Sequence, residues 1–168
     1  VRIASGARID VSGGSAGGDA GKLSVSTPQG AFVLDPGAAL AATAAAGARA
    51  GAFVLDAGSL PGGFPALNAV LNNAGFTAVR DMRLRTGDVA IGLGDLVRAR
   101  DFRLAADAGK IDVFGRIDAS GEQAGEVSLF AGGDLTVHGS ARIDAHATGA
   151  GEEGGTVVLG SRDGRVTL

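Results

Sequence analysis

Short segments of this chain return at intervals of roughly 20 to 26 residues, and this repetition limits what the chain can fold into. The segment GAFVLDPG, residues 30–37, returns as GAFVLDAG, residues 51–58, a shift of 21. DMRLRTGDVAI at 81–91 resembles DFRLAADAGKIDV at 101–113, shifted by 20, and Arg-Ile-Asp occurs at 8–10, 116–118 and 142–144. Such spacing is typical of one supersecondary unit used repeatedly, here about seven or eight times.

Within each unit the apolar residues alternate with polar ones. Examples are Leu23 and Val25, Met82 and Leu84, and Val127 and Leu129. This period of two predicts short strands with one buried face. Turn residues separate the strands, as in TGD at 86–88, DAGK at 107–110, AGGD at 131–134 and SRDG at 161–164.

A stack of coils hides the apolar face of such short strands better than isolated hairpins do, because each coil covers the one below it. The prediction is therefore an all-β parallel β-helix, or solenoid, in which residues 1–168 form a single segment. A β-sandwich or barrel is the alternative, since many short strands with glycine turns also fit it. Those folds do not ordinarily repeat near-identical segments at so short a spacing, so the solenoid is favoured.

Two segments depart from the repeating pattern. FPALNAVLNNAG, residues 64–75, places Leu67, Val70, Leu71 and Ala74 at helical spacing, with Pro65 in the first turn and Gly75 at a C-cap position. We predict one short helical insertion near 65–74. The alanine-rich stretch at 38–50 has strong helix propensity, but it lies between the two GAFVLD copies, which favours a narrow coil over a helix.

Composition excludes several classes of protein. The net charge of −3 and pI near 5.3 argue against nucleic-acid binding, which needs a basic surface. The chain has no cysteine, so thiolate catalysis and cysteine metal sites are excluded. No apolar run approaches the roughly 18 residues of a membrane span, and no signal peptide opens the chain. The 30 glycines lack a three-residue period, and 45% hydrophobic residues favour a folded chain.

Three segments together resemble a known family. GRIDASGEQAGEVSLFAGGDLTVHGSARIDA at 115–145, GAFVLDAGSL at 51–60 and GKIDVFGRIDASG at 109–121 resemble the internal repeat region of filamentous haemagglutinin-like exoproteins, which two-partner systems of Gram-negative bacteria secrete. The resemblance covers most of the chain and is weakest at 61–80. It implies a right-handed parallel β-helix, a secreted or cell-surface location, and an outer-membrane transporter as partner of the full-length protein. The chain would then be a fragment of a much longer fibre, which fits its start at Val1.

The charged motifs have structural explanations. In Arg-Ile-Asp, alternation turns Ile9, Ile117 and Ile143 inward and leaves Arg and Asp in solvent, where they form diagonal pairs between coils. His138 and His146 are the two histidines of the chain and are expected at the surface. GGSAGGDAGKL at 13–23 only partly follows the calcium-binding nonapeptide of other solenoids, and no nucleotide-binding glycine motif is present. We therefore assign no catalytic, cofactor-binding or metal residues.

Arginines gather between residues 80 and 103. If Arg83 and Arg103 stand over one another on neighbouring coils, they form a basic strip able to bind an anionic polysaccharide. Four aspartates lie among them, so a mixed, solvated face is the favoured interpretation. The arginines are Arg80, Arg83, Arg85, Arg98, Arg100 and Arg103, and the aspartates are Asp81, Asp88, Asp95 and Asp101.

These observations lead to an expected function. The chain is expected to be a non-catalytic, adhesive segment of rod that presents surfaces to host-surface glycans or receptors, or to neighbouring cells. One alternative is the stalk of a contact-dependent toxin. The other is a polysaccharide-active enzyme, because lyases and hydrolases also use parallel β-helices. Such enzymes need clustered carboxylates or basic groups in a groove, usually with aromatic platforms, and the chain has no Trp or Tyr.

Overall fold

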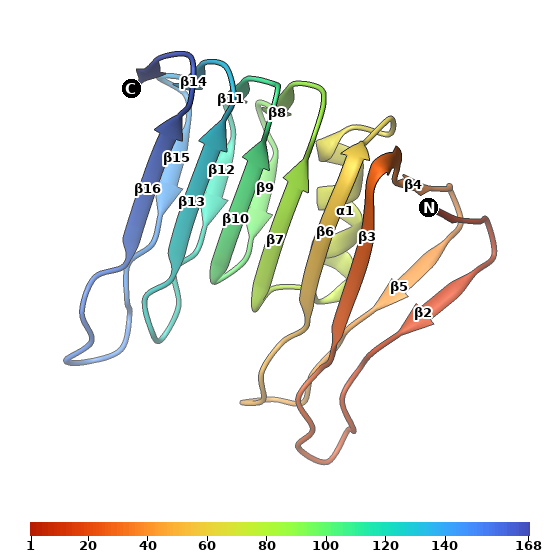
Figure 1. Ribbon diagram of the computed structural model, residues 1–168. Helices are drawn as coiled ribbons and strands as arrows, with labels where there is room; N and C mark the ends of the chain where they lie inside the picture. The colour runs from red at the N-terminus through yellow and green to blue at the C-terminus, as the bar shows by residue number, and fades with distance from the viewer.

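The computed structural model describes residues 1–168 as a right-handed parallel β-helix (Figure 1). Six parallel strands form one long sheet in the order β16-β13-β10-β7-β6-β3. The predicted fold class is therefore confirmed. The strands of this sheet are β3 (Lys22–Ala31), β6 (Ala52–Ser59), β7 (Val79–Leu84), β10 (Asp101–Ala106), β13 (Glu126–Ala131) and β16 (Thr156–Ser161).

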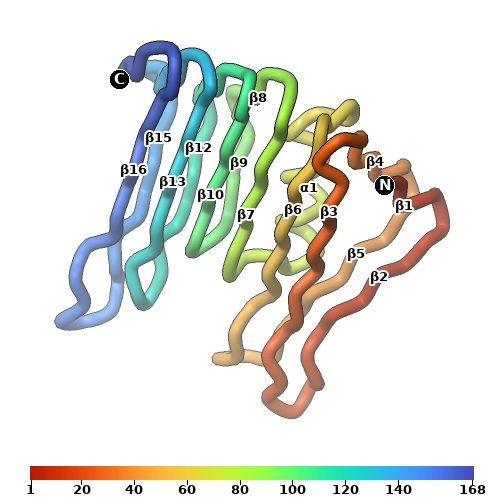
Figure 2. Tube along the Cα trace, in the orientation of Figure 1, coloured from red at the N-terminus to blue at the C-terminus, as the bar shows by residue number.

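Shorter strands form the other two faces of the solenoid, so that the chain path in Figure 2 is a series of stacked coils. One face carries β8 (Val89–Ile91), β11 (Ile111–Val113), β14 (Leu135–Val137) and β17 (Val166–Thr167). Another carries β9 (Leu96–Arg98), β12 (Arg116–Asp118) and β15 (Arg142–Asp144). Two pairs complete the N-terminal coils, β1 (Arg2–Ile3) with β4 (Val33–Leu34) and β2 (Arg8–Asp10) with β5 (Ala39–Ala41).

One helix, α1 (Phe64–Ala74), takes the place of two strands in the coil between β6 and β7. Pro65 lies in its first turn, and Gly75 ends it in the left-handed conformation, with φ of 86°. The apolar side of α1 is buried through Phe64, Leu67, Leu71 and Ala74. The predicted helix near 65–74 is thus confirmed.

The solenoid has about six coils rather than the seven or eight predicted, because most coils are longer than the sequence repeats indicate. The spacing between residues that pair along the long sheet also differs from coil to coil. Loops of different length between the strands account for this variation. One row of such partners consists of Lys22, Ala52, Val79, Asp101, Glu126 and Thr156.

The repeat of GAFVLD at a shift of 21 is not a coil period. Residues 33–34 of the first copy form β4, which pairs with β1, whereas the second copy forms β6 in the long sheet. The shift of 20 between 81–91 and 101–113 is also wrong, since β7 and β10 pair at a shift of 22. The alanine-rich stretch forms β5 and a loop, as the narrow-coil interpretation predicts.

Inward side chains from all but the last coil meet in one continuous core of 29 buried residues, and Leu159 of the last coil packs against this core. Ile117, Val127 and Leu135 are fully buried in it, and Ile143 packs against it from the next coil. Just after α1, the Phe76 ring meets the Phe53 ring edge to face, with centroids 5.8 Å apart. The core therefore runs through the solenoid as far as the last coil.

Candidate functional site

The Arg-Ile-Asp triplets hold neighbouring strands in register. In β12 and β15, Arg116 pairs with Arg142, Ile117 with Ile143 and Asp118 with Asp144, at the predicted shift of 26. The Arg116 guanidinium also reaches diagonally to Asp144, with Nε 3.0 Å from Oδ2. A hydrogen bond from Arg142, aided by Arg116, lowers the pKa of Asp144. The diagonal ion pair expected from the sequence is confirmed.

The alternative hypothesis of a basic strip, in which Arg83 and Arg103 stand over one another, is wrong. Because β7 and β10 pair at a shift of 22, Arg103 lies beside Asp81 and Arg83 lies beside Ala105. Arg83 pairs with Asp107 at 3.0 Å, and Arg103 pairs with Glu126 at 3.1 Å. The mixed-charge interpretation is therefore the correct one for this face.

Arg85, the next outward arginine of the predicted cluster, is neutralised in the same way. Its guanidinium bridges Asp56 at 2.7 Å and Asp107 at 3.2 Å. The hydrogen bond from Arg85 lowers the pKa of Asp56. The outer face of the long sheet therefore carries arginines whose charges are already compensated.

Arg80 is the largest departure from the predicted surface cluster, because its side chain is fully buried. It faces inward between Phe53 and Phe102 of the adjoining strands. Its guanidinium donates to the Phe76 carbonyl at 2.7 Å, to Asn68 Oδ1 at 2.8 Å and to Asn72 Oδ1 at 2.7 Å. Loss of hydration lowers the pKa of Arg80 to about 9. The two asparagine bonds join α1 to the long sheet, and the Phe76 bond ties in the connection that follows the helix.

The histidines do not form a site. His138 stacks on Phe114, with ring centroids 3.7 Å apart, and its Nε2 lies 2.9 Å from Asp112 Oδ1. His138 is half-buried and His146 is exposed in a separate loop. No three His, Cys, Asp or Glu side chains are grouped so that they could hold a metal ion. Residues 13–23 lie in the loop before β3 and at its start.

Loops of very different length leave the solenoid at one corner, where each coil enters the long sheet. Four long connections project there, and they are residues 11–21, 42–51, 119–125 and 145–155. The two coils between them turn the same corner in short connections, residues 75–78 and 99–100. Figure 1 shows the long loops extending past the short ones on both sides. The result is a notch across the corner, with short connections as its floor.

A glycine closes each long loop just before its strand, at positions 21, 51, 125 and 155. At Gly125, a Cβ atom would clash with the carbonyl oxygens of Arg100 and Ala119. At Gly155, it would clash with the carbonyl oxygen of Ala145. At these two positions the surrounding backbone is therefore so close that a side chain does not fit. At Gly51 an added Cβ would clash with the Cβ of Ala42, and at Gly21 it would lie in a tight contact 3.3 Å from Val11. We call these four positions the neck glycines.

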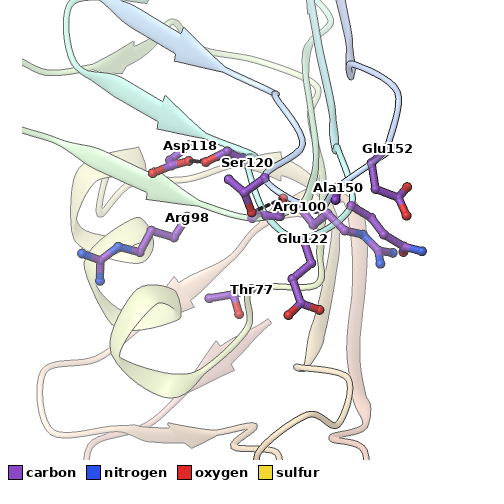
Figure 3. Close-up of a pocket in the computed structure, with 13 residues that line it drawn as sticks. Thr77, Arg98, Arg100, Asp118, Ser120, Glu122, Ala150 and Glu152 are labelled. Atoms are coloured by element: carbon purple, nitrogen blue, oxygen red, sulfur yellow. Dashed lines mark hydrogen bonds between the residues drawn. The ribbon is translucent and has the colours of Figure 1, made fainter.

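A polar groove of about 1010 Å³ fills the C-terminal side of this notch (Figure 3). Its floor comes from the short connections and its wall from the loops after β12 and β15. The groove contains no aromatic residue, and its two hydrophobic residues are alanines. The lining residues are Thr77, Arg98, Ala99, Arg100, Asp118, Ser120, Gly121, Glu122, Gln123, Thr148, Gly149, Ala150 and Glu152.

Several charges of the groove lack ion-pair partners. Arg98, Glu122 and Glu152 are exposed and unpaired, whereas Asp118 accepts from Ser120 and pairs with a neighbouring arginine. Figure 3 shows the carboxyl groups of Asp118, Glu122 and Glu152 pointing in different directions. The groove thus lacks the facing pair of carboxylates that glycoside hydrolysis commonly uses. It offers separate hydrogen-bond donors and acceptors along its length.

Sequence reasoning did not find this groove. It depends on the contrast between long and short connections at one corner, and that contrast emerges only when the strands are placed in register. The sequence does contain one signal for the long loops. A long loop begins at the last residue of each Arg-Ile-Asp-Ala or Arg-Ile-Asp-Val segment, at 8–11, 116–119 and 142–145. The equivalent strand β9 has no such triplet, and its connection is short.

Comparison with known proteins gives no relative: no family model, curated protein or solved structure matches the chain. The structure contains no helix that is both long and apolar enough to cross a membrane.

Proposed function

We propose that this chain is a non-catalytic, adhesive segment of a filamentous haemagglutinin-like exoprotein on the surface of, or secreted by, a Gram-negative bacterium. The proposal rests on one observation, which is that two parts of the surface differ in how their charged groups are paired. The outer face of the long sheet neutralises its arginines in ion pairs, as in Arg83–Asp107 and Arg103–Glu126. One corner instead gathers projecting loops and unpaired polar groups. Such a rod presents a binding surface at its corner, while the arginines of its long sheet are already paired.

The resemblance of residues 51–60 and 109–145 to the family's repeat region is a second support. A solenoid core supplies no function by itself, and function must come from a local site. The notch is the place where such a site is built on this chain. Its open, hydrogen-bonding surface suits contact with a receptor more than bond cleavage.

The test is adhesion of the purified chain to cells. Beads coated with the protein are incubated with cultured epithelial cells and, separately, with bacterial cells, and bound beads are counted. We expect binding above that of albumin-coated beads, and we expect soluble protein to compete for it. If protein-coated and albumin-coated beads bound equally well, the adhesive function would be overturned. Release of reducing sugar from polysaccharides by the protein would overturn its non-catalytic part.

A further inference from the structure

We infer that the groove between the loops binds a neutral, hydroxyl-rich oligosaccharide that crosses the corner of the solenoid. This inference rests on the proposed adhesive function and names the chemistry of its receptor. The size of the groove suits such a ligand. A volume of about 1010 Å³ is at the upper end of ordinary ligand sites, and the groove is open along the corner, so it suits a chain of several sugar rings.

The polar groups that line the groove match the hydroxyls of a sugar. Arg98 and Arg100 carry guanidinium donors, and Glu122, Gln123 and Glu152 carry planar acceptor groups. Adjacent hydroxyls of a sugar both donate and accept, so they satisfy such planar side chains two at a time.

The placement of these groups sets the shape of the ligand. Figure 3 shows Arg98 and Arg100 pointing to opposite ends of the groove, with Thr77 and Glu122 between them. A single small group does not reach both guanidiniums. The ligand is therefore extended.

The charge of the groove favours a neutral ligand over an anionic one. The lining holds two cations, Arg98 and Arg100, and three carboxylates, Asp118, Glu122 and Glu152. Arg100 is already paired with the adjacent aspartate at 3.2 Å, and Asp118 with an arginine of its own strand at 3.0 Å. The unpaired charges are then one arginine and two glutamates, a net negative site. Sulfated or uronate-rich polymers are repelled from such a site, whereas a neutral sugar is not.

An array of immobilised neutral and sulfated oligosaccharides, with heparin as a polyanionic probe, tests the inference. We expect the wild-type chain to bind neutral oligosaccharides, and to bind them equally well at low and moderate salt. Two double variants change the groove, Glu122→Ala with Glu152→Ala and Arg98→Ala with Thr77→Ala. Each removes hydrogen bonds from charged groups and should weaken binding by about tenfold or more.

Matched changes just outside the groove serve as controls. Glu153→Ala neighbours Glu152 in the same loop, and Arg165→Ala removes an exposed arginine of the last coil, and neither residue lines the groove. Both controls should bind like the wild type. Circular dichroism of every variant separates loss of binding from loss of folding.

Three results overturn the inference. They are the absence of any neutral oligosaccharide bound by the wild type, equal loss in groove and control variants, and preferential, salt-sensitive binding of heparin. In the last case, Lys22→Gln with Arg49→Gln would locate the polyanion, because these two residues line the hollow on the other side of the notch. If beads coated with the groove variants still adhere to cells, the proposed adhesive function stands, but the groove is not the binding site. Adhesion absent from the wild type would reject the proposed function itself.

Discussion

A single arginine shows how strongly position in the coil decides the role of a side chain. Arg80 belongs to a sequence cluster with Arg83 and Arg85, yet it is fully buried while its two neighbours lie in solvent-facing ion pairs. Strand alternation makes positions 80 and 83 face opposite sides of the sheet. A charged residue at an inward position is costly unless its hydrogen bonds are satisfied, and Asn68 and Asn72 of α1 supply acceptors.

Replacing Arg80 with methionine therefore has a large expected cost. The change leaves the buried oxygens of Asn68 and Asn72 without their donor, and we expect a loss of at least about 2 kcal/mol in the free energy of unfolding. Arg83→Met, on the outward side of the same strand, should cost less than about 1 kcal/mol. Urea denaturation of both variants measures the difference. Equal losses would mean that the Arg80 network does not stabilise the fold.

The neck glycines give a second prediction for single residues. Gly125→Ala places a methyl group against two carbonyl oxygens of the backbone. Since backbone cannot move aside as a side chain can, we expect a loss of roughly 1–3 kcal/mol or a displaced loop. Gly139→Ala is the control, because nothing lies within 4 Å of its added Cβ and its φ is not in the left-handed range. A Gly125→Ala protein as stable as the control would show that the neck can widen.

At the scale of elements, paired strands hold their register through side-chain charges as well as through the core. The pKa of Asp144 is lowered in the folded chain by Arg142 and Arg116. A carboxyl whose folded pKa lies below its unfolded value stabilises the fold above that unfolded value, and the contribution disappears as the pH falls through the folded pKa.

Asp144→Asn should therefore destabilise the chain near neutral pH and have no effect in strong acid. We expect a difference of about 0.2–1 kcal/mol between wild type and variant near neutral pH, which is typical of cross-strand charge pairs. The difference should shrink once the pH falls below about 4, the ordinary pKa of an aspartate, because the wild-type carboxylate is then progressively protonated. Denaturation midpoints at a series of pH values give the result. If the difference in stability between wild type and variant stayed constant down to strong acid, the ion pairs of Asp144 would not be its cause.

The elements differ in how far they follow from sequence. The helix and the inward isoleucines do follow, because helical spacing at 67–74 and alternation in Arg-Ile-Asp are local patterns. The pairing of distant strands does not follow from sequence. The same segment, GAFVLD, occurs once around β4 and once in β6, and these two strands pair with different partners. The loops at one corner differ widely in length, and this breaks any fixed period. The groove depends on those loop lengths, and therefore the sequence does not predict it either.

At the scale of the whole molecule, the last coil leaves part of the core uncovered. Val157 continues the inward row above Val127, yet it is 45% exposed, and Val158 on the outer side is 40% exposed. Strand β16 pairs only with β13, so one of its edges has free backbone groups. Open sheet edges promote association between chains.

We expect the isolated chain to associate through its ends as its concentration rises. Val157→Lys puts a charge where the apolar row is open and should suppress association, whereas Val158→Lys changes an outward residue of similar exposure and should not. Sedimentation velocity over a dilution series of the three proteins distinguishes these outcomes. A wild-type chain that stays monomeric at the highest concentration would contradict the prediction.

The neck glycines have a consequence for how such a molecule can change. Because each long loop closes on itself at its base, its length and composition are separated from the register of the strands beneath it. Neighbouring loops leave the rod about 4.8 Å apart, the distance between paired strands. Neighbouring long loops are also hydrogen-bonded to one another, since the Gly13 N–H donates to the Thr43 carbonyl and the Thr148 N–H donates to the Gly121 carbonyl. Insertions, deletions or grafted peptides should therefore leave the strands unchanged but affect both loops of a bonded pair, so that the corner can acquire new specificities one pair of loops at a time.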